Sequence, residues 1–263
     1  MTLQLHCIDT GSPKDDGETL PLVVLHGLFG SADNWRSHIK KWQSDRRVIA
    51  VDLRNHGRSP HVDGMQYAVM AADVVALLGD LDVQRFDLLG HSMGGKVAMT
   101  LARSHSERVA HLIVADIAPI AYDHGHDEIF AAMRRIEAGQ PTSRRDADAL
   151  MQEDIDGAAT RQFLATNLVR DDEGIMRWRV GLDEISAGYE DIIAAPDGDE
   201  PFDGPTLLIR GGKSHYVLEQ HRDAIEAIMP NVEWQTLENA GHWLHAEQPE
   251  AFREAVDRFL ADS

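Results

Sequence analysis

The chain has 263 residues, of which 43% are hydrophobic and 26% are charged, as expected for a folded protein with a sizeable core. Its net charge of −19 at pH 7 argues against binding to nucleic acid or to anionic membranes, since both need a basic surface. No apolar run approaches the roughly 18 residues of a membrane span, and we expect no signal peptide. Cys7 is the only cysteine, which predicts a reducing, cytoplasmic location.

Hydrophobic periodicity predicts strands that alternate with helices in the first half of the chain. In chain order we expect strands over 3–8, 21–26, 47–51 and 86–89, a polar turn over 10–19, and helices over 35–42 and 67–78. The first strand alternates apolar and polar residues and is expected to be half-exposed. The later strands are continuously apolar, which is typical of buried parallel strands.

The same rhythm returns near the C-terminus after a long interruption. Strands are predicted over 109–114, 206–210 and 232–237, and Pro249 opens a final helix. Strands that alternate with helices predict an α/β fold, with a mostly parallel central sheet flanked by helices. Between these parts we find no convincing strand, only helical spacings such as Ile129, Met133 and Ile136 or Phe163, Leu164 and Leu168. We therefore predict a core over 1–118 and 204–263, with a helical cap inserted over 119–203 between two strands.

Ser92 is the candidate nucleophile. It lies in Gly90-His91-Ser92-Met93-Gly94, between an apolar strand and a run that is compatible with a helix. The glycines two residues before and after the serine permit a sharp strand-to-helix turn, which would present the hydroxyl at the positive end of the helix. An ordinary glycine-rich turn is the alternative interpretation.

A serine nucleophile needs a base, and the chain has 14 histidines. His242 follows the last predicted strand after a short loop and the flexible Gly241, and it is the preferred candidate. His245 is the nearest rival, but it is expected on the following turn. His26 and His91 flank glycine motifs and are expected to be structural hydrogen-bonding groups. The segment His124-Gly125-His126-Asp127 and the pair His56 and His61 could suggest a metal, but ligands to complete a site are missing, so we expect no metal.

The acid that orients the base is predicted by elimination. In folds of this kind it usually follows the strand that ends at Arg210, yet the turn Gly211–Tyr216 holds no carboxylate. Asp116 ends the strand that follows the serine helix and could reach the same space; a loop hydrogen-bonding role is the alternative. Ser214 would lie where the acid usually does, and we expect its hydroxyl to hydrogen-bond to the pair of His242 and Asp116.

Two backbone N–H groups are expected to form an oxyanion hole. Met93 follows the nucleophile and supplies one. The loop His26-Gly27-Leu28-Phe29-Gly30 should supply the other, with Leu28 as the first choice and Phe29 as the second. The side chains of Leu28, Phe29, Met93 and Trp243 are predicted to form an apolar wall of the substrate pocket.

Together these motifs resemble the α/β-hydrolase superfamily over nearly the whole chain. The resemblance rests on the segments 26–31, 52–60, 90–96, 116–119, Arg210-Gly211-Gly212 and Gly241-His242. The combination of Arg54-Asn55-His56-Gly57 with Asp116-Ile117-Ala118-Pro119 and a serine in the Gly211–Tyr216 loop is similar to the small YbfF-type bacterial esterases. That likeness implies a carboxylesterase or thioesterase that acts on short acyl chains without a cofactor, with its acid on the strand that ends at Asp116.

The predicted function is therefore a cytoplasmic serine hydrolase that cleaves short- to medium-chain esters or thioesters through an acyl-enzyme. The expected partner is a small-molecule substrate, with no nucleic acid or membrane, and the expected oligomeric state is monomer or homodimer. A C–C bond hydrolase, a lactonase or a perhydrolase could use the same triad, and a non-catalytic acyl-binding module is a further alternative. Haloalkane dehalogenases and epoxide hydrolases are disfavoured, since they need a carboxylate where Ser92 stands.

Overall fold

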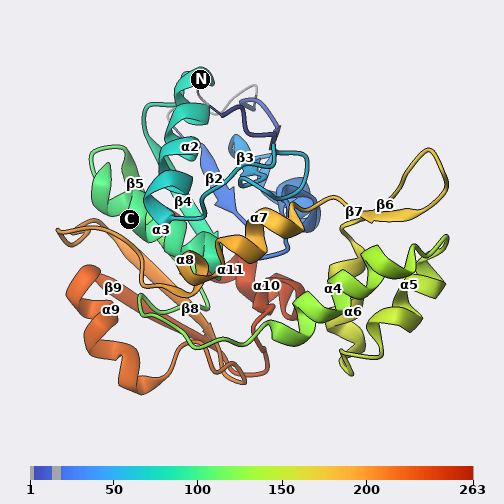
Figure 1. Ribbon diagram of the computed structural model, residues 1–263. Coiled ribbons are helices and arrows are strands. Elements are labelled where there is room, and N and C mark those ends of the chain that lie inside the picture. The colour runs from blue at the N-terminus through green and yellow to red at the C-terminus, as the bar shows by residue number, and fades with distance from the viewer. Residues whose placement is uncertain (1–2, 14–18, 263) are drawn as a thin grey trace.

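The structure is a computed structural model that describes residues 3–13 and 19–262 (Figure 1). Seven strands form a central sheet in the order β1-β3-β2-β4-β5-β8-β9. Strand β1 is antiparallel to β3, and the other neighbours are parallel, which confirms the predicted mostly parallel sheet. The strands of this sheet are β1 (Cys7–Asp9), β2 (Leu22–Leu25), β3 (Val48–Val51), β4 (Phe86–His91), β5 (Val109–Ala115), β8 (Thr206–Gly211) and β9 (Val232–Leu237).

Helices cover both faces of the sheet because alternate residues of each strand point to opposite sides. Val23 and Leu25 of β2 belong to a core with α2 (Tyr67–Asp80) and α3 (Met93–Ser104). Leu22 and Val24 belong to a second core with η1 (Ala32–Trp35), α1 (Arg36–Trp42), α10 (Leu244–Glu247) and α11 (Pro249–Asp262). The short η2 (Glu219–His221) and α9 (Arg222–Ile228) precede β9. None of the described helices is both long and apolar enough to span a membrane.

The segment between β5 and β8, residues 119–203, is called the insertion below. Its elements are α4 (Asp127–Gly139), α5 (Arg144–Met151), α6 (Ala158–Ala165), β6 (Leu168–Arg170), β7 (Met176–Trp178), α7 (Leu182–Ala187) and α8 (Tyr189–Ile193). Helices α4, α5 and α6 gather with β6 and β7 on one side of the sheet, whereas α7 and α8 lie closer to it (Figure 1).

Two predictions about strands were wrong. The insertion contains an antiparallel pair, β6 and β7, and Leu168 begins β6 instead of continuing the helix of Phe163 and Leu164. At the N-terminus the strand is Cys7–Asp9, shorter than predicted, because its partner β3 ends at Val51 and the chain then turns. His6 instead hydrogen-bonds through its N–H to the Ser59 hydroxyl at 2.8 Å. Residues 14–18 of the predicted polar turn lie outside the described residues.

Candidate active site

Ser92 lies between the end of β4 and the start of α3, with a φ of 54°. This positive φ is strained for a residue with a side chain. The flanking glycines are needed because the backbone passes very close on both sides. A Cβ at Gly90 would lie 2.2 Å from the Gly94 carbonyl oxygen, and one at Gly94 would lie 2.5 Å from the His26 carbonyl oxygen. The turn therefore presents a half-buried hydroxyl directly beside the end of β2.

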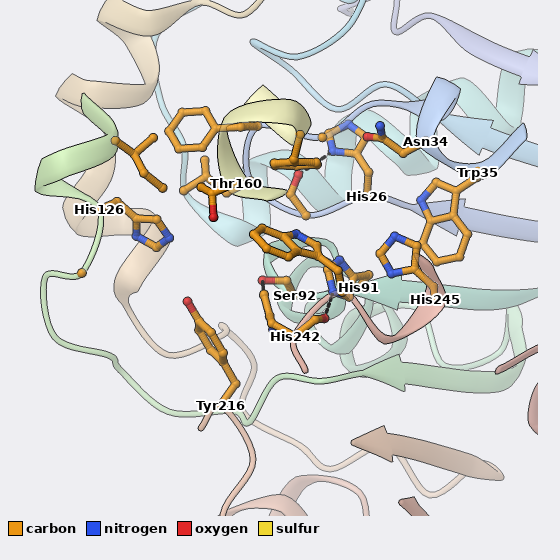
Figure 2. Close-up of a pocket in the computed structure, with 18 residues that line it drawn as sticks. His26, Asn34, Trp35, His91, Ser92, His126, Thr160, Tyr216, His242 and His245 are labelled. Carbon is orange, nitrogen blue, oxygen red and sulfur yellow. Dashed lines mark hydrogen bonds between the residues drawn. The ribbon is translucent and has the colours of Figure 1, made fainter. Parts of the chain in front are cut away.

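The candidate nucleophile, base and acid form one hydrogen-bonded chain. His242 Nε2 lies 2.9 Å from Ser92 Oγ, and His242 Nδ1 lies 2.8 Å from Asp116 Oδ2 (Figure 2 shows Ser92 and His242). Asp116 is fully buried at the end of β5. Its Oδ1 accepts the Gly211 N–H at 2.9 Å, and its Oδ2 also accepts the Ser214 hydroxyl. With the carboxylate holding the Nδ1 proton, Nε2 presents its lone pair to Ser92.

The loop after β8 sets the direction of the Ser214 hydroxyl. Ser214 N–H donates to the Gly211 carbonyl at 3.1 Å, which closes a tight turn. Tyr216 N–H donates to Ser214 Oγ at 3.2 Å. Because Oγ accepts from Tyr216, its own proton is directed to the Asp116 carboxylate. The serine thus occupies the position expected from the sequence, as an additional donor to the carboxylate.

Two aromatic side chains hold His242 in place. The Tyr216 ring stacks on the imidazole with centroids 4.0 Å apart and an interplanar angle of 22°. His91 holds the backbone of His242: its Nε2 lies 2.8 Å from the His242 carbonyl oxygen and donates to it. Burial holds the pKa of His91 well below its usual range, so this ring is neutral. The structural hydrogen-bonding role predicted for His91 agrees with this contact.

The rival base, His245, lies in α10, is buried and borders the first cavity lobe, but it is His242 that hydrogen-bonds to Ser92. Its ring stacks on Trp35 with centroids 4.5 Å apart. Burial lowers its pKa to about 3, and its carbonyl accepts the ring N–H of His38 at 2.9 Å. His245 is therefore a neutral residue that packs against Trp35 at the edge of the site.

The loop 26–30 packs directly on the serine turn. The Gly30 N–H donates to the Gly27 carbonyl at 2.9 Å, which makes residues 27–30 a β-turn. Phe29 has a φ of 58°, and a type II turn requires a positive φ at its third position. A Cβ at Gly27 would lie 3.1 Å from the Ser92 Cβ. Since Gly30 N–H closes the turn, the N–H groups of Leu28 and Phe29 are the candidates in this loop for an oxyanion hole.

Two further groups complete this region. His26 Nε2 accepts the Leu53 N–H at 3.0 Å, so its Nδ1 carries the proton and donates to the Gly27 carbonyl at 2.8 Å. His26 thus ties the loop to the segment after β3, in the structural role predicted for it. Met93 is the first residue of α3, and the first N–H groups of a helix have no partner within it.

Two cavity lobes meet at Ser92. One, whose lining residues are drawn in Figure 2, has a volume of about 250 Å³. Phe29 and Trp243 line it. The other has a volume of about 310 Å³ and is lined by Met93. Leu28 borders both lobes. All four residues predicted for the apolar wall therefore line the cavity, distributed over two lobes.

The histidines that could have suggested a metal make other contacts. They are paired with neighbouring groups: His124 with Glu190, His126 with the Tyr189 hydroxyl, His56 with the Arg54 carbonyl and His61 with the Arg179 carbonyl. Among residues 3–13 and 19–262, no three His, Cys, Asp or Glu side chains converge as metal ligands.

Comparison with known proteins identifies the family. The sequence pattern of the alpha/beta hydrolase fold matches residues 21–249. The chain belongs to the α/β-hydrolase family. It is 41% identical over 256 residues to the mouse sn-1-specific diacylglycerol lipase ABHD11, covering 94% of this chain and 83% of that protein. It is 38% identical over 243 residues to the Escherichia coli esterase YbfF, covering 92% and 93%. A solved structure described as a marine microorganism esterase has a TM-score of 0.91 and 36% identity, covering 98% of this chain and 99% of that one.

Lys96 is a cavity-lining residue of this α/β hydrolase that the sequence did not predict. Lys96, in the first turn of α3, lines the second lobe although it is only 1% exposed. Its Nζ donates to the carbonyls of Ile193 at 3.3 Å and Ala194 at 2.5 Å, and it lies 4.8 Å from the centroid of the Tyr122 ring. Burial lowers its pKa to about 7. A lysine that follows two glycines is visible in the sequence, but no pattern indicates that its amine is inside.

Tyr216 was also missed as a functional candidate. It lies in the Gly211–Tyr216 loop that the sequence singled out only for its missing carboxylate. In the structure its ring borders both lobes as well as His242. From the insertion, His126 and Gly125 border both lobes too.

Proposed function

We propose that this protein is a serine hydrolase that cleaves short- to medium-chain carboxylic esters or thioesters through an acyl-enzyme. The observation that carries the proposal is the continuous chain from Ser92 Oγ to His242 at 2.9 Å and on to Asp116 at 2.8 Å. These distances lie within the hydrogen-bond reach that nucleophile, base and orienting acid require. Membership of the family and the similarity to named esterases support the same chemistry.

In the proposed reaction, His242 Nε2 takes the proton of Ser92 as its oxygen attacks the substrate carbonyl. The buried Asp116 carboxylate stabilises the imidazolium. The N–H groups of Met93 and of Leu28, or Phe29 as the second choice, stabilise the oxyanion. His242 then protonates the leaving alcohol or thiol. In the second half, it activates a water that releases the acid and restores Ser92.

The cavity supports small substrates. The first lobe, of about 250 Å³, lies just below the roughly 300–1,000 Å³ that ligand pockets occupy, and the second, of about 310 Å³, lies at the lower end of that range. Because both lobes meet at Ser92, one can hold the acyl group and the other the leaving group. Residues of the insertion, such as Ile129, Thr160 and Phe163, border the first lobe. We infer that the insertion acts as a cap over core segments 1–118 and 204–263.

A kinetic panel tests this function. We expect p-nitrophenyl butyrate to be cleaved faster than the laurate ester, and Ser92→Ala to serve as an inactive blank. The same panel should include acyl-CoA thioesters, a lactone, a diketone that is cleaved at a C–C bond, and an assay for peracid formation. All of these reactions can use the same triad. A preference for the lactone, for C–C bond cleavage or for peracid formation would replace the assignment to esters or thioesters. Faster cleavage of the laurate ester would contradict the short-chain assignment.

A further inference from the structure

Asn167 is a residue of the insertion that reaches the loop beside the nucleophile. It lies between α6 and β6 and is fully buried. Its Nδ2 donates to the Phe29 carbonyl at 2.6 Å, across 138 positions of sequence. Its backbone is held on both sides: the N–H donates to the Leu164 carbonyl at 2.9 Å, and the carbonyl accepts the Arg179 N–H at 2.9 Å. These two backbone hydrogen bonds fix Asn167 relative to the rest of the insertion.

The contact fixes one peptide plane of the loop. The Phe29 carbonyl belongs to the same peptide unit as the Gly30 N–H, which donates to Gly27 at 2.9 Å. Asn167 therefore holds one side of this plane and Gly27 the other. Phe29 has a φ of 58°, a conformation that type II turns usually give to glycine or asparagine. A side chain in this conformation persists only when the surroundings hold it, and the Asn167 bond is one such constraint.

The other polar atom of Asn167 has no partner. Its Oδ1 is buried and accepts no hydrogen bond from any residue in the described part of the chain. Burying an unpaired carbonyl costs free energy that an apolar side chain of similar size would avoid. The side-chain amide of Asn167 therefore contributes only its Nδ2 donor, which is directed at the Phe29 carbonyl.

We propose that Asn167 is a positioning residue that orients the Leu28 and Phe29 N–H groups toward the oxyanion. This inference rests on the proposed function, because it assumes that loop 26–30 supplies an oxyanion donor. Asn167 is not among the described residues that line the two lobes, so it acts through the loop and not by touching substrate. The consequence is that oxyanion stabilisation depends on the insertion being seated on the core.

The substitution Asn167→Leu removes the Nδ2 donor of Asn167 with little change in side-chain volume. Removing one oxyanion donor typically costs about 100- to 1,000-fold in kcat, and misorienting one should cost part of that. We expect kcat for p-nitrophenyl butyrate to fall about 10- to 100-fold, with KM changed less than about threefold. The affinity for a trifluoromethyl ketone, whose serine adduct carries the oxyanion, should fall by the same factor as kcat/KM.

A matched control removes another hydrogen bond between insertion and core. Gln66 Nε2 donates to Asp191 Oδ2 at 2.7 Å on the exposed side of the molecule. Gln66→Ala should leave kcat and the affinity for the trifluoromethyl ketone within about twofold of wild type, since a surface polar contact contributes little. Equal losses in Gln66→Ala and Asn167→Leu would overturn the specific role of Asn167.

Asn167→Asp adds a pH signature that a purely structural role would not give. The ionised carboxylate would repel the Phe29 carbonyl, whereas the protonated acid could donate to it. We expect the ratio of variant to wild-type kcat to rise at least fivefold between pH 8 and pH 5.5, and a flat ratio would overturn the proposal even if Asn167→Leu fails to fold. Wild-type kcat in a folded Asn167→Leu would also overturn it. Loss of the proposed function is distinguishable, since the wild type would then show no turnover and no fluorophosphonate labelling.

Discussion

The change Asp116→Asn tests the assigned acid most sharply, because the structure fixes how the new amide must sit. The Gly211 N–H, which can only donate, lies 2.9 Å from Oδ1, so the amide oxygen must take that position. The amide nitrogen then takes the place of Oδ2 and donates to His242 Nδ1. That bond forces the proton of the neutral imidazole onto Nε2, which faces Ser92 at 2.9 Å and can no longer accept its proton.

The expected loss in kcat/KM is about 10⁴-fold, as for other triads held in the wrong tautomer, which corresponds to about 5 kcal/mol of transition-state stabilisation. Ser214→Ala removes one of three donors to the same carboxylate. A bond to a charged group contributes about 1.5–3 kcal/mol, but much of it is present in the ground state too, so activity should fall only about tenfold.

The assay is the initial rate of p-nitrophenyl butyrate hydrolysis by both variants, with folding checked by thermal unfolding. Asp80→Asn, at an exposed carboxylate at the end of α2, is the matched control and should retain wild-type activity. If Asp116→Asn keeps more than about a tenth of the activity, or loses less than Ser214→Ala does, Asp116 does not orient His242 as argued.

Two further predictions concern stability. The pKa of Lys96 falls from about 10.5 unfolded to about 7 folded, so between these pH values the unfolded state binds more protons and stability rises with pH. Lys96→Met should flatten this rise, by at most about 3 kcal/mol between pH 7 and pH 9.5 in urea unfolding, and an unchanged difference would refute the assignment. Gly57→Ala should lower the free energy of unfolding by about 2 kcal/mol or more, since its Cβ would lie 2.1 Å from Asp52 Cγ at a φ of 56°. Gly79→Ala, with nothing within 4 Å, should be neutral or stabilising, and equal losses would refute the steric argument.

Hydrophobic periodicity was sufficient to predict the five inner strands of the sheet, because they are buried and almost continuously apolar. The apolar runs at 21–26 and 109–114 correspond to β2 and β5, and Pro249 begins α11 as predicted. The β6–β7 pair was missed because each strand has only three residues, too few for an alternation to register. Leu168 also continues the spacing of α6, so a helix was the better local fit.

In the candidate site, too, the residues that local sequence patterns mark could be predicted, whereas those that depend on contacts between distant segments could not. Ser92 could be predicted because the glycines that shape its turn are only two residues away in the sequence. His242 could be predicted because it follows the last strand after a short loop. Asp116 could be reached only by elimination, since strand order and not sequence spacing brings β5 beside β8. Asn167 and Tyr216 could not be found, because their contacts with Phe29 and His242 depend on how distant segments pack.

The central claim is that Ser92 is the nucleophile activated by His242. Its most direct test is intact-protein mass spectrometry after reaction with a fluorophosphonate, followed by peptide mapping of the adduct. We expect one adduct per chain on Ser92 in the wild type, with no adduct and no ester hydrolysis in Ser92→Ala. Equal labelling of Ser92→Ala, or an adduct mapped to a different residue of the wild type, would contradict the account.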